Sequence, residues 1–137
     1  MDRVFVDTNI VLDLLAKREG FYRDASQLFS LADKQKLSLC VSSLTFANTH
    51  YLLARQLSPA AARKVLRDLN VLVLVLPLDD KVLKLALNSD FNDFEHAIQY
   101  FTAMEHNIPL ILTRNLKDFK TSKIPVMTAA DYLARLA

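Results

Sequence analysis

The sequence has a single glycine, Gly20, and a single cysteine, Cys40. Mechanisms in which a glycine-rich loop cradles a phosphate are therefore excluded, and with them the P-loop NTPases and the dinucleotide-binding Rossmann proteins. One cysteine also excludes an intramolecular disulfide and any cysteine-based zinc cluster. Because Cys40 lies in the apolar run Leu39–Val41, we expect it to be a buried structural thiol.

The sequence also lacks a strong excess of positive or negative charge, and it lacks long hydrophobic runs. The net charge of +2 fits almost any partner and does not by itself point to nucleic acid. The longest apolar run, Val71–Leu78, has the length of a strand, whereas a membrane helix needs about 20 apolar residues. The N-terminus meets Asp2 before any apolar region of a signal peptide could form. We therefore expect a cytoplasmic, reduced protein with no membrane association.

Apolar residues make up 52% of the 137 positions, which predicts one compact domain over residues 1–137. Short apolar runs alternate with segments of helical period. The predicted strands are Val4–Val6, Leu37–Val41, Val71–Leu76, Leu110–Leu112 and Pro125–Met127, and the predicted helices cover about 9–17, 21–34, 43–55, 59–69, 79–87, 92–106 and a C-terminal segment capped by Thr128. This alternation predicts an α/β fold of three layers, with a central, mostly parallel sheet flanked by helices.

Two local features carry more specific expectations. The Val- and Leu-rich run Val71–Leu76 is typical of a fully buried parallel strand. Asn92, with Glu95 three residues later, predicts a capping-box variant at the start of the helix that runs to about His106.

The carboxyl ends of parallel strands meet at one edge of a sheet, where such folds place their sites. Asp7 follows the first predicted strand, and Asp118 comes shortly after the Leu110–Leu112 strand. Asp93 and His96, at i and i+3, share one face of a helix start. Carboxylates that converge in this way repel one another unless a cation lies between them, and hard oxygen ligands suit Mg²⁺ or Mn²⁺.

Each of these residues also has a purely structural interpretation. Asp7 could cap the helix that follows it, Asp118 could form a turn, and Asp93 could be a favourable charge in the first turn of a helix. His96 could be a capped or solvated helix histidine, and Asn48 an ordinary amide on a helix surface. The order and context of the residues, taken together, favour a site.

Four segments of the sequence resemble the PIN-domain proteins, the family of the VapC-type toxin ribonucleases. They are Val4–Leu12 (VFVDTNIVL), Val41–Thr45 (VSSLT), Asp93–Gln99 (DFEHAIQ) and Leu112–Phe119 (LTRNLKDF), and their order and spacing match over nearly the whole chain. The resemblance implies a parallel sheet with flanking helices and an endoribonuclease site that uses Mg²⁺ or Mn²⁺. For toxin members it also implies an RNA substrate, a homodimer and a cognate antitoxin.

The resemblance assigns roles to individual positions. Asp7 matches the family's first metal-binding aspartate, and Asp93 matches an additional acidic position of some branches. Asn115 and Asp118 fall in the last acidic region. The implied catalytic residues are Asp7, Asp93 and Asp118; the implied metal ligands are Asp7, Asp93, His96, Asn115 and Asp118; and the candidate substrate contacts are Asn9, Ser43, Asn48, Arg114 and Lys117.

Two positions depart from the family pattern. Asn48 stands where many members have a glutamate, and His96 stands where an aspartate is usual. An amide loses one unit of charge, and a neutral imidazole is a poor ligand for Mg²⁺ but a better one for Mn²⁺, Zn²⁺ or Fe²⁺. We therefore expect weaker Mg²⁺ binding than in members with a full acidic set. A PIN-like domain that has lost catalysis but still binds RNA or a protein partner is the alternative.

A third class is phosphoryl transfer through Asp7 as nucleophile, as in haloacid-dehalogenase-like phosphatases or response-regulator receivers. The phosphatases need a second aspartate two residues later, where this chain has Asn9. Receivers need a lysine after a late strand, where this chain has Thr113 and Arg114. Both departures disfavour this class.

Overall fold

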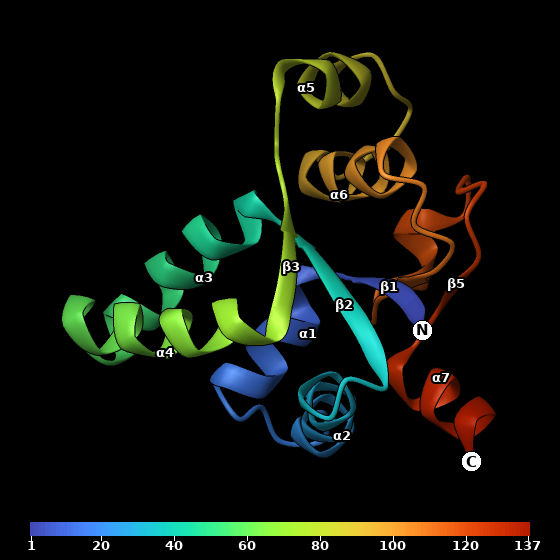
Figure 1. Ribbon diagram of the computed structural model, residues 1–137. Coiled ribbons are helices and arrows are strands. Elements are labelled where there is room, and N and C mark those ends of the chain that lie inside the picture. The colour runs from blue at the N-terminus through green and yellow to red at the C-terminus, as the bar shows by residue number, and fades with distance from the viewer.

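The computed structural model describes residues 1–137, which form a five-stranded parallel sheet with helices on both faces. The strands are β1 (Asp2–Val6), β2 (Leu37–Ser42), β3 (Val73–Leu76), β4 (Ile111–Leu112) and β5 (Val126–Met127). The helices are α1 (Thr8–Leu15), α2 (Tyr22–Asp33), α3 (Ser43–Gln56), α4 (Pro59–Leu72), α5 (Asp80–Leu87), α6 (Phe94–Glu105), α7 (Ala129–Leu136) and the short 3₁₀ helix η1 (Leu116–Phe119). The strand order is β3-β2-β1-β4-β5, and every neighbouring pair is parallel (Figure 1).

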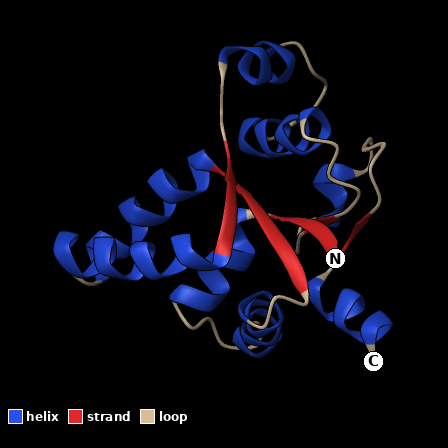
Figure 2. Cartoon of the chain, viewed as in Figure 1, coloured by secondary structure: helices blue, strands red, loops and turns tan.

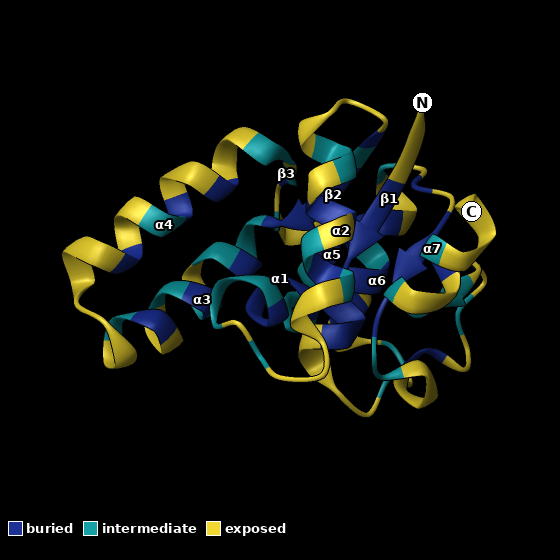
Figure 3. Ribbon diagram, turned by 90° about the horizontal axis from the view of Figure 1, so that it is seen from below, coloured by how far each residue is buried: buried dark blue, intermediate teal, exposed yellow.

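Alternation along the central strands divides the core into two layers. Val4 and Val6 of β1 pack with residues of α1, α2, α4 and α7, whereas Phe5 between them packs with residues of α6. Helix α5 then packs on the outer side of α6. Figure 2 shows the strands at the centre with helices around them, and Figure 3 shows that the inward faces are buried while the outer face of α4 is exposed. The predicted three-layer α/β fold is confirmed, with a sheet that is parallel throughout.

The prediction of a fully buried strand over Val71–Leu76 is wrong in two respects: the strand starts later, and it is only partly buried. Residues 71 and 72 complete α4, and β3 begins at Val73. Because β3 pairs only with β2, it is an edge strand, and the side chain of Leu74 is 47% exposed. A run of Val and Leu predicts a parallel strand but not its position within the sheet.

The N-terminus of α6 also differs from the expectation. Asp93, and not Asn92, is the N-cap, and its Oδ1 accepts a hydrogen bond from His96 N at 2.9 Å. Glu95 therefore has no role in a capping box. The cap expected at Thr128 is confirmed, because its hydroxyl accepts a hydrogen bond from Asp131 N, and Ser42 caps α3 in the same way by accepting one from Leu44 N.

Cys40 is fully buried in the sheet, as expected, and burial raises the pKa of its thiol. No helix combines the length and the apolar character needed to cross a membrane. Because all five strands run in the same direction, Asp7 after β1, Ser43 after β2 and Thr113 after β4 lie along the same edge of the sheet. The site is built at this edge.

Candidate metal and catalytic site

A cavity of about 430 Å³ opens at the carboxyl edge of the sheet, between the segments that follow β1 and β4, the middle of α3 and the start of α6. We call it the acidic cavity, because four carboxylates, those of Asp7, Asp93, Glu95 and Asp118, line it. Its other lining residues are Thr8, Asn9, Leu12, Arg18, Asn48, Tyr51, Leu52, His96 and Asn115. The cavity thus brings together every residue for which the sequence predicted a catalytic or metal-binding role.

Asp7 is buried at the end of β1, and its carboxylate does not cap α1, although Asp7 occupies the N-cap position. Its Oδ2 instead accepts a hydrogen bond from Thr113 Oγ1 at 2.7 Å and lies 3.3 Å from His96 Nε2. The side chain of Gln99 accepts a hydrogen bond from Thr8 N at 3.2 Å and so satisfies the start of α1. The carboxylate of Asp7 is therefore not used to cap α1 and instead lines the cavity.

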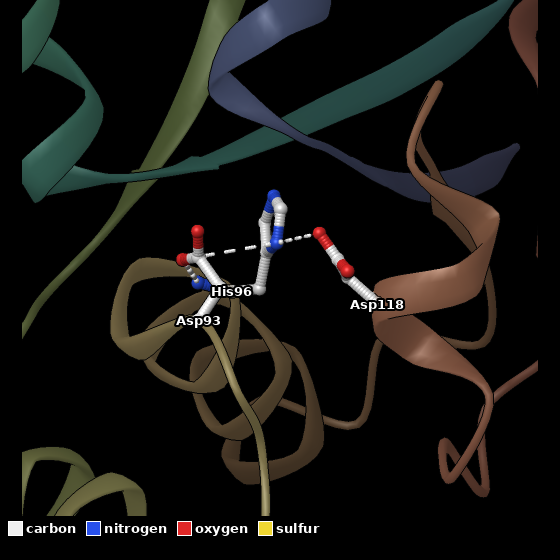
Figure 4. A group of neighbouring side chains, drawn as sticks. All are labelled: Asp93, His96 and Asp118. Carbon is white, nitrogen blue, oxygen red and sulfur yellow. Dashed lines mark hydrogen bonds and ion pairs between the residues drawn. The ribbon is translucent and has the colours of Figure 1, made fainter.

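His96 lies between the carboxylates, in the first turn of α6. Its Nδ1 is 3.0 Å from Asp118 Oδ2 and 3.7 Å from Asp93 Oδ1, as Figure 4 shows, and its side chain is only 7% exposed. Nδ1 is buried and has no hydrogen-bond partner, since the contact with Asp118 lacks hydrogen-bond geometry. A buried polar atom without a partner is costly, and here it faces two carboxylates.

The charges in the cavity shift the pKa values of Asp7 and His96 in opposite directions. Burial by itself would raise the pKa of Asp7, but His96, Thr113 and Gln99 outweigh burial and hold this pKa below its ordinary value of 3.8. Burial would lower the pKa of His96, but interactions with Asp7, Asp93 and Asp118 raise it above 6.5. Without a metal, a protonated His96 is therefore the counter-ion of the carboxylates.

The donor set fits a divalent cation. One ligand atom each from Asp93, His96 and Asp118 can be chosen so that all lie within 4.8 Å of one another. Two carboxylates and an imidazole suit Mn²⁺ better than Mg²⁺, because Mg²⁺ prefers oxygen ligands. Asp7 contacts the other ring nitrogen, where its carboxylate can orient His96, as carboxylates commonly do for metal-bound imidazoles.

Asn48 contacts Glu95, a cavity residue that the sequence analysis did not include among the site residues. Asn48 Nδ2 donates a hydrogen bond of 2.8 Å to Glu95 Oε1, and both residues line the acidic cavity. The sequence assigned Glu95 to a capping box, and that motif is absent. The asparagine at position 48, where many family members have a glutamate, was the one sequence signal that could have pointed to Glu95. A missing carboxylate at one position suggests that another residue supplies it.

Three candidate substrate contacts lie apart from the cavity lining. The hydroxyl of Ser43 accepts a hydrogen bond from Leu78 N at 3.0 Å. Arg114 Nε and Nη2 each lie 3.0 Å from a carboxylate oxygen of the buried Asp13, and its guanidinium stacks 3.9 Å above the Phe21 ring. Lys117 is exposed on η1. Asn9 and Asn48, by contrast, line the cavity.

Two further lining residues are Tyr51 and Arg18. Tyr51 is 64% exposed on α3, and the guanidinium of Arg55 lies 5.6 Å from the centre of its ring. Arg18 brings a positive charge to the lining and lies 3.8 Å from Asp13 Oδ1. Tyr51 has no motif of its own, so only its position beside the acidic residues identifies it.

Comparison with known proteins places this site in a family context. The chain is 25% identical to ribonuclease VapC1 of Aquifex aeolicus (strain VF5) over 139 residues, which cover 98% of this chain and 95% of the relative. A toxin–antitoxin complex from Klebsiella pneumoniae matches with a TM-score of 0.68 and 23% identity, covering 92% of this chain and 97% of that one. Mycobacterium tuberculosis VapC20, a toxin that cleaves the sarcin-ricin loop, matches with a TM-score of 0.63 and 19% identity, covering 79% and 86%. These structural likenesses concern the fold.

The family assignment rests on the sequence match. Residues 3–117 match the PIN domain, a range that includes every lining residue of the acidic cavity except Asp118, which follows it directly. The resemblance inferred from the four sequence segments is thereby confirmed: the chain belongs to the PIN-domain family.

Proposed function

We propose that this protein is a divalent-metal-dependent endoribonuclease that acts as the toxin of a toxin–antitoxin pair. The observation that carries the proposal is the buried, unpartnered Nδ1 of His96, which faces the carboxylates of Asp93 and Asp118 within the acidic cavity. The ribonuclease and toxin relatives support the same assignment.

In this proposal each residue has a definite task. Asp93, His96 and Asp118 hold a Mn²⁺ or Mg²⁺ ion, and Asn115 offers an amide oxygen beside them. Such an ion lowers the pKa of a bound water and stabilises the charge that develops on a phosphodiester. Asp7 fixes the ring of His96 through Nε2 and is itself fixed by Thr113. Loss of either contact would misplace the metal ligands.

The rim of the cavity supplies the contacts for RNA. Arg18 and Asn9 can meet phosphate oxygens, and the exposed ring of Tyr51 offers a surface on which an unpaired base can stack. Lys117, on the exposed surface of η1, adds a charge for the flanking backbone. These features favour a single-stranded segment or a loop over a duplex.

The test is cleavage of total RNA with Mn²⁺, with Mg²⁺ and with a chelator, using Asp7→Asn as the matched variant. We expect cleavage with Mn²⁺, weaker cleavage with Mg²⁺, and none with the chelator or with the variant. Cleavage that persists in the chelator, or that is unchanged in Asp7→Asn, would show that the acidic cavity is not the catalytic site.

A second function deserves the same assay, because Asn48 and His96 replace two acids of the family pattern. A PIN domain that binds RNA or a protein partner without cleaving RNA would retain labelled RNA in a binding assay but leave it intact with every metal. This outcome would show that the protein is a binding module that uses the same surface and not an enzyme.

Partners and organisation complete the proposal. Several structural relatives are toxin–antitoxin complexes, and this supports an antitoxin partner for this chain as well. We also propose that residues 1–137 act as one domain, that the protein forms a homodimer and that it acts on RNA in the cytoplasm. Light scattering measures the dimer, and co-purification with the product of a small adjacent reading frame tests for the antitoxin.

A further inference from the structure

We propose that Glu95, held in place by Asn48, supplies the carboxylate that position 48 lacks, so that the cavity keeps the charge of four acids. This inference rests on the proposed metal site. Glu95 is thus a further functional residue of the cavity, and Asn48 is a positioning residue that acts through it.

The first support is the hydrogen bond that joins the two side chains. Asn48 comes from α3 and Glu95 from α6, 47 positions apart in sequence, and Nδ2 of Asn48 donates to Oε1 of Glu95 at 2.8 Å. An exposed glutamate is free to turn toward solvent. An amide donor at the cavity lining instead favours the rotamer that keeps the carboxylate over the acidic cavity.

The second support is independent of the acidic residues. The buried Nδ1 of His96 has no hydrogen-bond partner and faces the carboxylates of Asp93 and Asp118, an arrangement that suits a shared cation. A positive charge is therefore favoured at this atom, either a proton on His96 or a metal ion that replaces the proton. Four carboxylates around one buried imidazole and Arg18 leave the lining acidic.

The position of Glu95 indicates how it acts. The atoms that converge within 4.8 Å come from Asp93, His96 and Asp118, and Glu95 is outside this group. Mg²⁺ and Mn²⁺ sites of this kind keep several water ligands, and carboxylates of the outer sphere accept hydrogen bonds from them. We therefore assign Glu95 to the outer sphere, where its charge and its oxygens hold water that is bound to the ion.

The α3 side of the cavity is also fixed relative to Asp7. The hydroxyls of Thr8 and Thr45 lie 2.8 Å apart and connect the start of α1 to α3. Thr45 is buried three residues before Asn48. Asn48 is therefore presented from a helix that is anchored next to Asp7, and a glutamate at position 48 would direct its carboxylate into the same region as that of Glu95.

The test exchanges the two residues. We compare the wild type, Glu95→Gln and the double variant Asn48→Glu/Glu95→Gln by calorimetric titration with MnCl₂, and confirm folding by circular dichroism. Glu105→Gln is the matched control, because it makes the same change on the same helix, about 15 Å away along its axis.

We expect Glu95→Gln to bind Mn²⁺ about tenfold more weakly, since one charge acts on a divalent ion across a water molecule. The double variant should recover to within about threefold of the wild type, and the control should be unchanged. The proposal is overturned if Glu95→Gln binds as the wild type does, or if the folded double variant remains as weak as Glu95→Gln. A wild type that binds no Mn²⁺ overturns both this inference and the proposed metal site, whereas equal binding by wild type and Glu95→Gln overturns this inference alone.

Discussion

The stability of the metal-free protein should depend on pH through His96. The pKa of His96 is raised by its carboxylate neighbours, against the opposing effect of burial. A raised histidine pKa means that the stabilisation is fully present below the unfolded value of 6.5 and is lost as the pH rises through the folded value. Asp7 acts in the opposite range: its lowered pKa adds stability that is lost only below pH 3.8. Between pH 6 and 8.5 the contribution of His96 therefore changes, while that of Asp7 does not.

The size of the effect follows from the contact between His96 and Asp7. At 3.3 Å from Asp7, an effective dielectric constant of about 20 gives an attraction of about 5 kcal/mol for a charged His96. The desolvation of the buried ring opposes most of this attraction, and charged hydrogen-bonded groups contribute about 1.5–3 kcal/mol in practice. We expect the free energy of unfolding to fall by about 2 kcal/mol, which corresponds to a urea midpoint lower by about 1 M.

The assay is urea denaturation followed by circular dichroism in a chelator, at several pH values from 6 to 8.5. His96→Gln is the reference, because it removes this imidazole alone and leaves the rest of the chain unchanged. The wild type should lose stability with rising pH, and the variant should show a nearly flat profile. Parallel profiles for the two proteins, or a wild type that gains stability with rising pH, would refute the role of His96 as counter-ion.

Three further outcomes are expected. Arg114→Met should lower the free energy of unfolding by about 2 kcal/mol in urea denaturation, because it removes both 3.0 Å contacts of the buried Asp13 carboxylate and leaves it only Arg18 at 3.8 Å; a loss below about 1 kcal/mol would contradict this. Tyr51→Ala should weaken binding of labelled single-stranded RNA about tenfold in fluorescence anisotropy, while Tyr22→Ala, outside the cavity, should not; equal losses would exclude base stacking at Tyr51. Mn²⁺ affinity, measured calorimetrically, should fall as the pH drops from 8 to 6, since a proton on His96 competes with the ion, and a constant affinity would remove His96 from the ligands.

The fold was predictable because its signal repeats along the chain. Short apolar runs between helical segments indicate a parallel sheet, and the alternation of Val4, Phe5 and Val6 between two cores shows why β1 is apolar throughout. The burial of β3 was not predictable. Whether a strand lies at the centre or the edge depends on which other strands pair with it, and Val71–Leu76 carries no information about that.

The site residues that lie at strand ends and helix starts were predictable from the sequence. Asp7, Asp93, His96 and Asp118 follow directly from the carboxyl edge and the family pattern, and the structure brings them together. The partner of Arg114 did not follow, because Asp13 is 101 positions away and a buried ion pair leaves no local motif. The position of Glu95 in the cavity lining did not follow from the sequence either, because a capping box was a simpler explanation of the same residue.

The place of β4 in the sheet has a consequence for the newly made chain. β1 pairs with β2 on one side and with β4 on the other, so one side of this central strand stays open until residue 112 has been synthesised. The cavity also needs Asp7 and Asp118, whose synthesis on a ribosome is separated by roughly 6 to 20 s. A nascent chain therefore carries no complete cavity, and any activity of this site begins only after Asp118 has been synthesised.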